Sequence, residues 1–187
     1  MTLSALGIFS AAGAGGAPQT YELIETQILG STQSSITFSN LGNFSSTYRH
    51  LQIRSAPKSN SSAASGLGWV RLNGSLNGNT TDSNYAVHGL FGNGSSVTSF
   101  AETSSRKGFG VASRTNENFA ANVTDILDAY SSTKNKTTRT MAGMNGIVAM
   151  YSHLFNNTGS ITSVSLTTED GSSFVSGSRF SLYGIRG

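Results

Sequence analysis

The sequence has no cysteine, two prolines and three histidines among its 187 residues. The absence of cysteine excludes a secreted disulfide scaffold and any thiolate chemistry. Charged residues make up only 11% of the chain, against about 25% in a typical soluble domain. The net charge is +3, but the basic residues are scattered and form no long run of the kind that binds nucleic acid. We therefore expect no nucleic-acid partner.

Long apolar runs are also missing, including at the N-terminus. Residues 1–20 contain no Lys or Arg, whereas a secretory signal needs a positively charged region before its apolar stretch. A membrane-spanning helix needs about 20 consecutive apolar residues, and here the Gly-Ala-Gly-Gly tract at 13–16 and Pro18 end the run early. We expect neither a signal peptide nor a membrane partner.

Residues 1–20 instead suggest an extended arm that docks on another protein. Full burial of one large apolar side chain stabilises by about 1.5–3 kcal/mol, and the glycines behind the apolar positions allow many backbone conformations. Packing as a strand of the chain's own sheet and disorder are the alternatives. The candidate docking residues are Leu3, Leu6, Ile8 and Phe9.

Residue patterns for catalysis or metal binding are scarce. The histidines have no zinc-ligand spacing, and the sequence contains neither HExxH nor G-x-S-x-G. Asp125 and Asp128 form a candidate carboxylate pair, but residues three apart on a strand point to opposite faces. The segment TEDGSS (168–173) is typical of a turn with a salt-bridged acid, with a calcium loop as the alternative. We expect no enzymatic activity, no cofactor and no bound metal.

Alternation of apolar and polar residues is the main pattern in residues 21–187, and it predicts β-strands. One helix candidate, 117–129, fits a strand equally well. Asn-Gly and Asp-Gly pairs between the segments are typical of tight turns. We therefore predict an all-β fold, an antiparallel β-sandwich or jelly roll over 21–187 with an N-terminal arm over 1–20. The predicted strands are 21–29, 35–39, 50–54, 68–73, 84–91, 97–102, 108–112, 121–130, 136–142, 147–155, 163–167 and 179–186.

Aromatic residues lie in or beside many of these segments. Their expected role is core packing, because strand aromatics in sandwiches mostly point inward. The alternative is a row of exposed rings that stacks on sugars. In that case Trp69 and Tyr85 would face a glycan, together with the Ser-, Asn- and Gly-rich loops at 55–67 and 73–84.

The order of several segments resembles a known family. The chain ends in FVSGSRFSLYGIRG (174–187), with a Gly-Ser-x-Phe-Ser-Leu-Tyr-Gly-Ile signature. Before it come, in order, YELIETQILGSTQSSITFSNL (21–41), YRHLQIRS (48–55), VRLNGSLNGNTTDSNYAVHGLFGNGSS (70–96), DILDAYSSTKNKTTRTMAG (125–143) and GSITSVSLTTEDGSSFVSGS (159–178). Residues 21–187 thereby resemble a β-sandwich module of tailed bacteriophages, especially those of marine bacteria and cyanobacteria. Leu72 replaces a usual Phe, and 74–82 is longer than usual.

The resemblance implies a non-enzymatic virion structural protein, either a capsid decoration or cement protein or a tail-fibre-like appendage. Such a protein would be assembled in the host cytoplasm and located in the virion. Its expected partners are other virion proteins of the capsid or tail and further copies of itself, with a trimer as our prediction. The family transfers no catalytic residue. The alternative function is a carbohydrate-binding, receptor-recognising module of a tail appendage, with a host surface glycan as partner.

Overall fold

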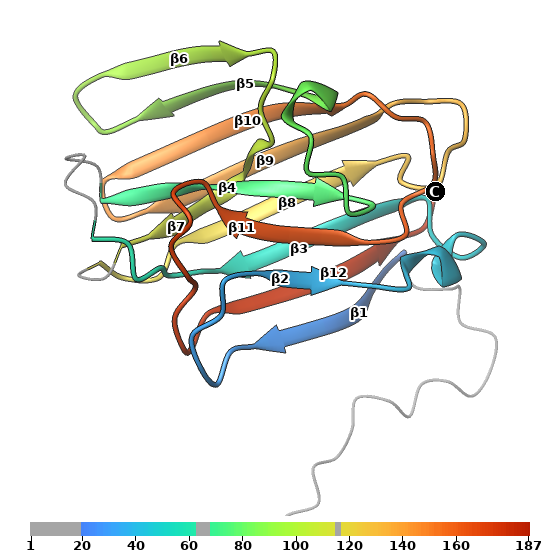
Figure 1. Ribbon diagram of the computed structural model, residues 1–187, viewed down its shortest axis with the longest axis horizontal. Coiled ribbons are helices and arrows are strands. Elements are labelled where there is room, and N and C mark those ends of the chain that lie inside the picture. The colour runs from blue at the N-terminus through green and yellow to red at the C-terminus, as the bar shows by residue number, and fades with distance from the viewer. Residues whose placement is uncertain (1–19, 63–67, 115–116) are drawn as a thin grey trace, which may run out of the picture.

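Two antiparallel β-sheets of unequal width pack face to face (Figure 1). The computed structural model describes residues 20–62, 68–114 and 117–187, so only Thr20 of the expected arm is described. The wide sheet contains, in spatial order, β1 (Tyr21–Ile28), β12 (Arg179–Ile185), β3 (His50–Ala56), β8 (Ala121–Leu127), β9 (Lys136–Met144), β10 (Ile147–Phe155), β5 (Tyr85–Gly92) and β6 (Val97–Glu102).

The narrow sheet lies across one face of the wide sheet (Figure 1). Its order is β2 (Ile36–Phe38), β11 (Val164–Thr168), β4 (Trp69–Leu76) and β7 (Lys107–Ser113). Two short 3₁₀ helices, η1 (Leu41–Phe44) and η2 (Asp82–Asn84), complete the elements of the described residues. The predicted β-sandwich is confirmed, with strands at all twelve predicted positions.

The helix alternative for 117–129 is wrong, because β8 occupies this segment and pairs with β3 on one side and β9 on the other. Its residues alternate in burial, with Thr124 and Ile126 buried and Val123 and Leu127 exposed. This alternation is the period-two pattern of a strand between two neighbours. A helix at this position would form neither the backbone hydrogen bonds to β3 nor those to β9.

The main core lies between the two sheets. Ile53 and Leu182 of the wide sheet and Leu72 and Leu166 of the narrow sheet belong to one cluster of buried side chains. A second cluster, which includes Trp69, Val87, Val111 and Tyr151, lies toward the β5 and β6 end of the wide sheet. Sheets that pack face to face interdigitate their inner side chains in this way.

Strand β4 is longer than predicted, because it continues to Leu76 and not only to residue 73. Gly74 makes this extension possible: an added Cβ would lie 2.1 Å from the ring of Phe109. The Leu76 backbone N–H donates to the Tyr85 hydroxyl at 3.0 Å, which ties the end of β4 to the start of β5. The expected outer loop 73–84 is therefore reduced to the residues between β4 and η2.

A buried lysine holds together the connections at one end of the sandwich. Lys136 is 0% exposed, and its Nζ donates to the carbonyl oxygens of Ser131, Lys134 and Thr158 at 2.5–3.0 Å. Burial lowers the pKa of Lys136, an effect that the charge of Asp128 partly offsets. The three carbonyl groups replace the water that the ammonium group loses on folding.

A side chain completes the hydrogen bonding of β7, which is the edge strand of the narrow sheet. The Asn122 Oδ1 accepts from the Val111 N–H at 2.9 Å, and its Nδ2 donates to the Val111 carbonyl at 3.0 Å. Nδ2 also donates to the Ser55 hydroxyl at 3.1 Å. Gly110, at φ +133°, leaves room for this side chain, since an added Cβ would lie 2.8 Å from it. Asn122 thus joins the two sheets.

We expect Asn122→Ala to reduce the free energy of unfolding by about 1–3 kcal/mol, because two buried backbone groups of Val111 would lose their partner. Urea denaturation followed by tryptophan fluorescence measures the change. Asn135→Ala is the matched control, since Asn135 is exposed and its side-chain amide donates to the exposed Asn156 side chain at 3.0 Å; its effect should stay within about 0.5 kcal/mol. Equal losses in the two variants would contradict this account.

Candidate functional site

The candidate site is the face of the wide sheet that points away from the narrow sheet, called here the open face. Side chains alternate between the two faces of each strand. On β10, for example, Ala149, Tyr151 and His153 are buried while Val148, Met150 and Leu154 are exposed. The narrow sheet covers one face only (Figure 1), so half of the side chains of the wide sheet line the open face.

Four large apolar side chains form a continuous line on the open face, called here the apolar row. The strand register pairs Val123 with Met141, Met141 with Met150, and Met150 with Leu90 across β8, β9, β10 and β5. Their exposed fractions are 39%, 59%, 42% and 43%. Adjacent strands lie about 4.8 Å apart, so the side chains stand next to one another. Apolar surface gathered in this way marks a site of protein contact more often than isolated exposed residues do.

Two hollows extend the apolar row at its ends. One has a volume of about 610 Å³ and lies around Leu90, Met150 and Ala101. The other has a volume of about 630 Å³ and lies around Val123, Met141 and Tyr183. The open face between β12 and β6 therefore offers a recess for apolar side chains at each end of the row.

Three of the charged residues that border the apolar row, Asp125, Arg139 and Arg54, have contacts within the chain. Asp125 accepts from Arg139 at 2.9 Å and from the Gln52 amide at 2.7 Å. The Arg54 guanidinium lies about 5 Å from the ring centres of Tyr21 and Tyr183, which is a cation–π arrangement. A partner that covers the row would leave these pairs in place at its rim.

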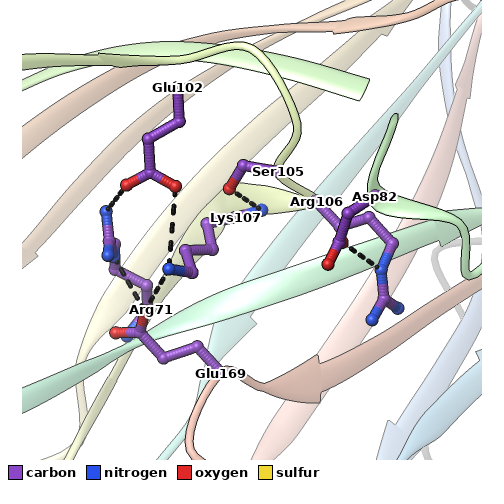
Figure 2. A network of polar contacts seen from close by, with 7 residues as sticks. All are labelled: Arg71, Asp82, Glu102, Ser105, Arg106, Lys107 and Glu169. Carbon is purple, nitrogen blue, oxygen red and sulfur yellow. Dashed lines mark hydrogen bonds and ion pairs between the residues drawn. The ribbon is translucent and has the colours of Figure 1, made fainter. Parts of the chain in front are cut away.

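A second polar feature links the two sheets at the β6 side. Figure 2 shows Arg71 of β4 between Glu102 of β6 and Glu169 of the turn after β11, with both N···O distances at 3.0 Å. Lys107 lies 3.6 Å from each of the two carboxylates. These four residues, Arg71, Lys107, Glu102 and Glu169, are called here the quartet. Each of them lies next to an oppositely charged group, so the quartet connects the two sheets.

The protonation of Glu102 follows from its surroundings in the quartet. Burial alone would raise its pKa, but the Ser105 hydroxyl and the charges of Arg71 and Lys107 outweigh it and hold the pKa of Glu102 below its ordinary value. The carboxylate therefore stays ionised at neutral pH. A carboxyl group of this kind is a poor general acid, because a general acid needs a raised pKa.

A pocket of about 270 Å³ lies beside the quartet. Its lining includes Trp69, Phe91, Phe100, Arg71 and Glu102, which come from both sheets. The Trp69 Nε1 is buried and has no hydrogen-bond partner among the described residues. The pocket thus combines aromatic surface with charged groups.

Trp69 and Tyr85, which would face a glycan in the alternative to core packing, have buried rings. Trp69 is 4% exposed, and its ring meets Phe91 edge to face at 5.5 Å. Tyr85 is 1% exposed and stacks on Phe155 at 4.7 Å. Neither face of these rings is open to a sugar ring, so the burial agrees with the expected core packing and not with the alternative of exposed rings. Both rings gain more from burial in the core than from solvent contact.

The remaining sequence candidates have structural partners or lie outside the described residues. Asp125 and Asp128 bind different cations, since Asp128 pairs with Arg49 at 2.7 Å and Lys134 at 2.8 Å. Residues 168–173 form a turn in which Glu169 is salt-bridged, as expected. No group of three or more potential metal-ligating side chains occurs in the described ranges. The docking candidates Leu3, Leu6, Ile8 and Phe9, and residues 63–67 of the loop 55–67, are outside the description.

The apolar row was missed from the sequence, although β10 carries a signal for it. Its sequence, IVAMYSHLF, is apolar at both odd and even positions, which indicates that both faces of the strand meet apolar surroundings. Only the register shows that Met141 of β9 and Leu90 of β5 stand beside Met150. No protein-family model matches the chain, and no curated protein matches it. In the part of the chain that the structure describes, no helix has the length and apolar character needed to cross a membrane.

A buried histidine gives the fold a sensitivity to acid. His153 lies between Phe109 and Tyr85, with ring centres 4.8 and 5.2 Å away. Burial lowers the pKa of His153 from 6.5 to about 4, and the backbone of Ser105 partly opposes the shift. The unfolded chain therefore binds more protons than the folded chain between about pH 4 and 6.5, so stability is lost as the pH falls through that range.

We expect the free energy of unfolding to decrease by about 3 kcal/mol between pH 6.5 and 4 through His153 alone. His153→Leu should remove this part of the acid sensitivity, whereas His88→Leu, at an exposed position on β5, should keep it. Urea unfolding at a series of pH values measures both slopes. If His153→Leu retained the full slope of the unmodified chain, the histidine would not be its source.

Proposed function

We propose that this chain is a non-enzymatic structural component of a bacteriophage particle, either a capsid decoration or cement protein or a tail-fibre-like appendage. It acts in the virion, where it binds capsid or tail proteins and further copies of itself, with three copies per assembly as our prediction. The phage assignment is supported by the resemblance of residues 21–187 to the bacteriophage β-sandwich module. The low content of charged residues and the apolar candidates in residues 1–20 agree with it.

The observation that carries the structural role is the apolar row with its two hollows on the open face. Exposed apolar surface of this kind favours a function in which another protein covers it. Asp125 and Arg139 at its border are already paired with each other, so these two charges would stay compensated on contact. A rim of satisfied polar groups around an apolar centre is the usual make-up of a protein interface.

Deleting residues 1–17 should leave a folded β-sandwich that no longer enters particles, because the candidate docking side chains would be lost. Purified particles from cells that express the truncated chain, analysed by mass spectrometry, measure incorporation, and circular dichroism checks the fold. A Thr2→Ser chain serves as control and should be incorporated normally. Normal incorporation of the truncated chain, or absence of the full chain from particles, would refute the proposal.

A second candidate function is a carbohydrate-binding module of a tail appendage, and the pocket beside the quartet favours it. Aromatic surface and two carboxylates meet there, and such a combination suits a small polar ring. The recognition would use the edge of Trp69 and the half-buried Phe91, not the ring faces of Trp69 and Tyr85.

On a glycan array, this second function predicts binding that Phe91→Ser weakens by about tenfold or more. Phe119→Ser is the control, because Phe119 is an exposed aromatic residue outside the pocket lining. No binding of the unmodified chain to any host surface glycan would leave the structural role alone.

A further inference from the structure

We propose that the apolar row and its two hollows on one copy of this chain are the acceptor for the first nine residues of a neighbouring copy. The inference rests on the proposed function and goes further by naming the partner and both contacting surfaces. Each copy then donates one segment and accepts one. A donor and an acceptor at different places on the same molecule form a heterologous interface, which can close into a ring.

The chemistry of the two surfaces matches. No side chain among residues 1–21 is charged, and the candidate docking side chains among the first nine residues are Leu3, Leu6, Ile8 and Phe9. On the acceptor side, Met141 and Met150 lie at the centre of the row. Methionine is unbranched and polarisable, so it adapts its shape to an incoming apolar side chain. The hollows of about 610 and 630 Å³ provide room on both sides of the row.

Electrostatics does not oppose this contact. The charged residues next to the row are Asp125 and Arg139, which pair with each other, Arg54, which lies over Tyr21 and Tyr183, and the exposed Arg179, which lines one hollow. A peptide without charged side chains can cover the row without breaking these pairs. A partner rich in charged residues would instead have to leave its charges beside apolar surface, which is costly.

The length of chain before β1 is sufficient. Thr20 is held at the edge of the wide sheet, where its carbonyl accepts from the Arg186 N–H at 2.9 Å. Residues 10–19 can span up to about 33–36 Å, whereas the four strand spacings from β1 to β9 amount to about 19 Å. The connecting segment is therefore long enough for a distance of the size that separates β1 from the apolar row. We assign the acceptor to an adjacent copy because the proposed function requires the segment to act between subunits.

The natural absence of cysteine allows a direct test by disulfide trapping. One tagged chain carries Phe9→Cys, and a second chain with a different tag carries Met150→Cys. We expect a disulfide between the two differently tagged chains to form about tenfold faster than with Thr137→Cys as the acceptor. Thr137 is the matched control, because it is exposed on β9 on the same face as Met141 of the apolar row. It lines neither hollow. Equal rates for the two acceptors would overturn the inference.

A single chain that carries both Phe9→Cys and Met150→Cys shows which copy supplies the segment. The inference expects the disulfide to join two chains at concentrations where the unmodified protein is oligomeric. A disulfide formed only within one chain would mean that the segment covers its own sheet, and this result would overturn the inference.

Oligomer formation provides a readout that does not need cysteine. Sedimentation of the full chain should show that Met150→Glu raises the dissociation constant by about tenfold or more, whereas Thr137→Glu leaves it unchanged. Met150→Ser removes the apolar side chain without adding a charge and should weaken assembly in the same direction. Melting curves check that each variant is folded. Unchanged assembly in both folded Met150 variants would overturn the inference.

The particle experiment separates this inference from the proposed function. If deletion of residues 1–17 prevents incorporation but Met150→Glu does not, the proposed function stands and the acceptor assigned here is wrong. If the deletion has no effect on incorporation, the proposed function itself fails. Loss of incorporation in both chains, with normal behaviour of Thr137→Glu, supports the inference.

Discussion

The apolar contact between the inner faces of the two sheets is the interaction on which the rest of the structure depends. It buries Ile53 and Leu182 of the wide sheet against Leu72 and Leu166 of the narrow sheet, and hydrophobic burial of this kind is the dominant favourable contribution to folding. Because strand side chains alternate, the same backbone that supplies the inner face also creates an outer one. The open face is thus a direct result of covering a wide sheet on one side only.

Polar side chains at the junction of the sheets form directional hydrogen bonds and ion pairs in addition to this apolar contact. Asn122 completes the hydrogen bonds of Val111, and the quartet around Arg71 connects β6 to the narrow sheet. A chain with few charged residues uses several of them in such internal pairs. Buried polar groups that are fully paired fix one arrangement of the sheets relative to the alternatives. This leaves the open face as the surface where apolar groups remain available.

The strands could be predicted from the sequence, because alternation is a local property of each segment. The segment 147–155 is the strand β10 with the predicted bounds, and 97–102 is β6. The surroundings of single residues could not be predicted in the same way. Core packing was the expected role of Trp69 and Tyr85, but the rings that they contact, Phe91 and Phe155, could be identified only from the structure. The apolar row likewise depends on register across four strands, which no single segment contains.

The carbonyl groups around Lys136 have a consequence for chemical labelling. Its Nζ is held by Ser131, Lys134 and Thr158, whereas the other three lysines, Lys58, Lys107 and Lys134, are not fully buried. An acylating reagent needs a free amine and an open path to it, so it would react with those three first. The rate at which Lys136 is modified would then report how often these connections open locally. No residue would have to be substituted to measure that opening.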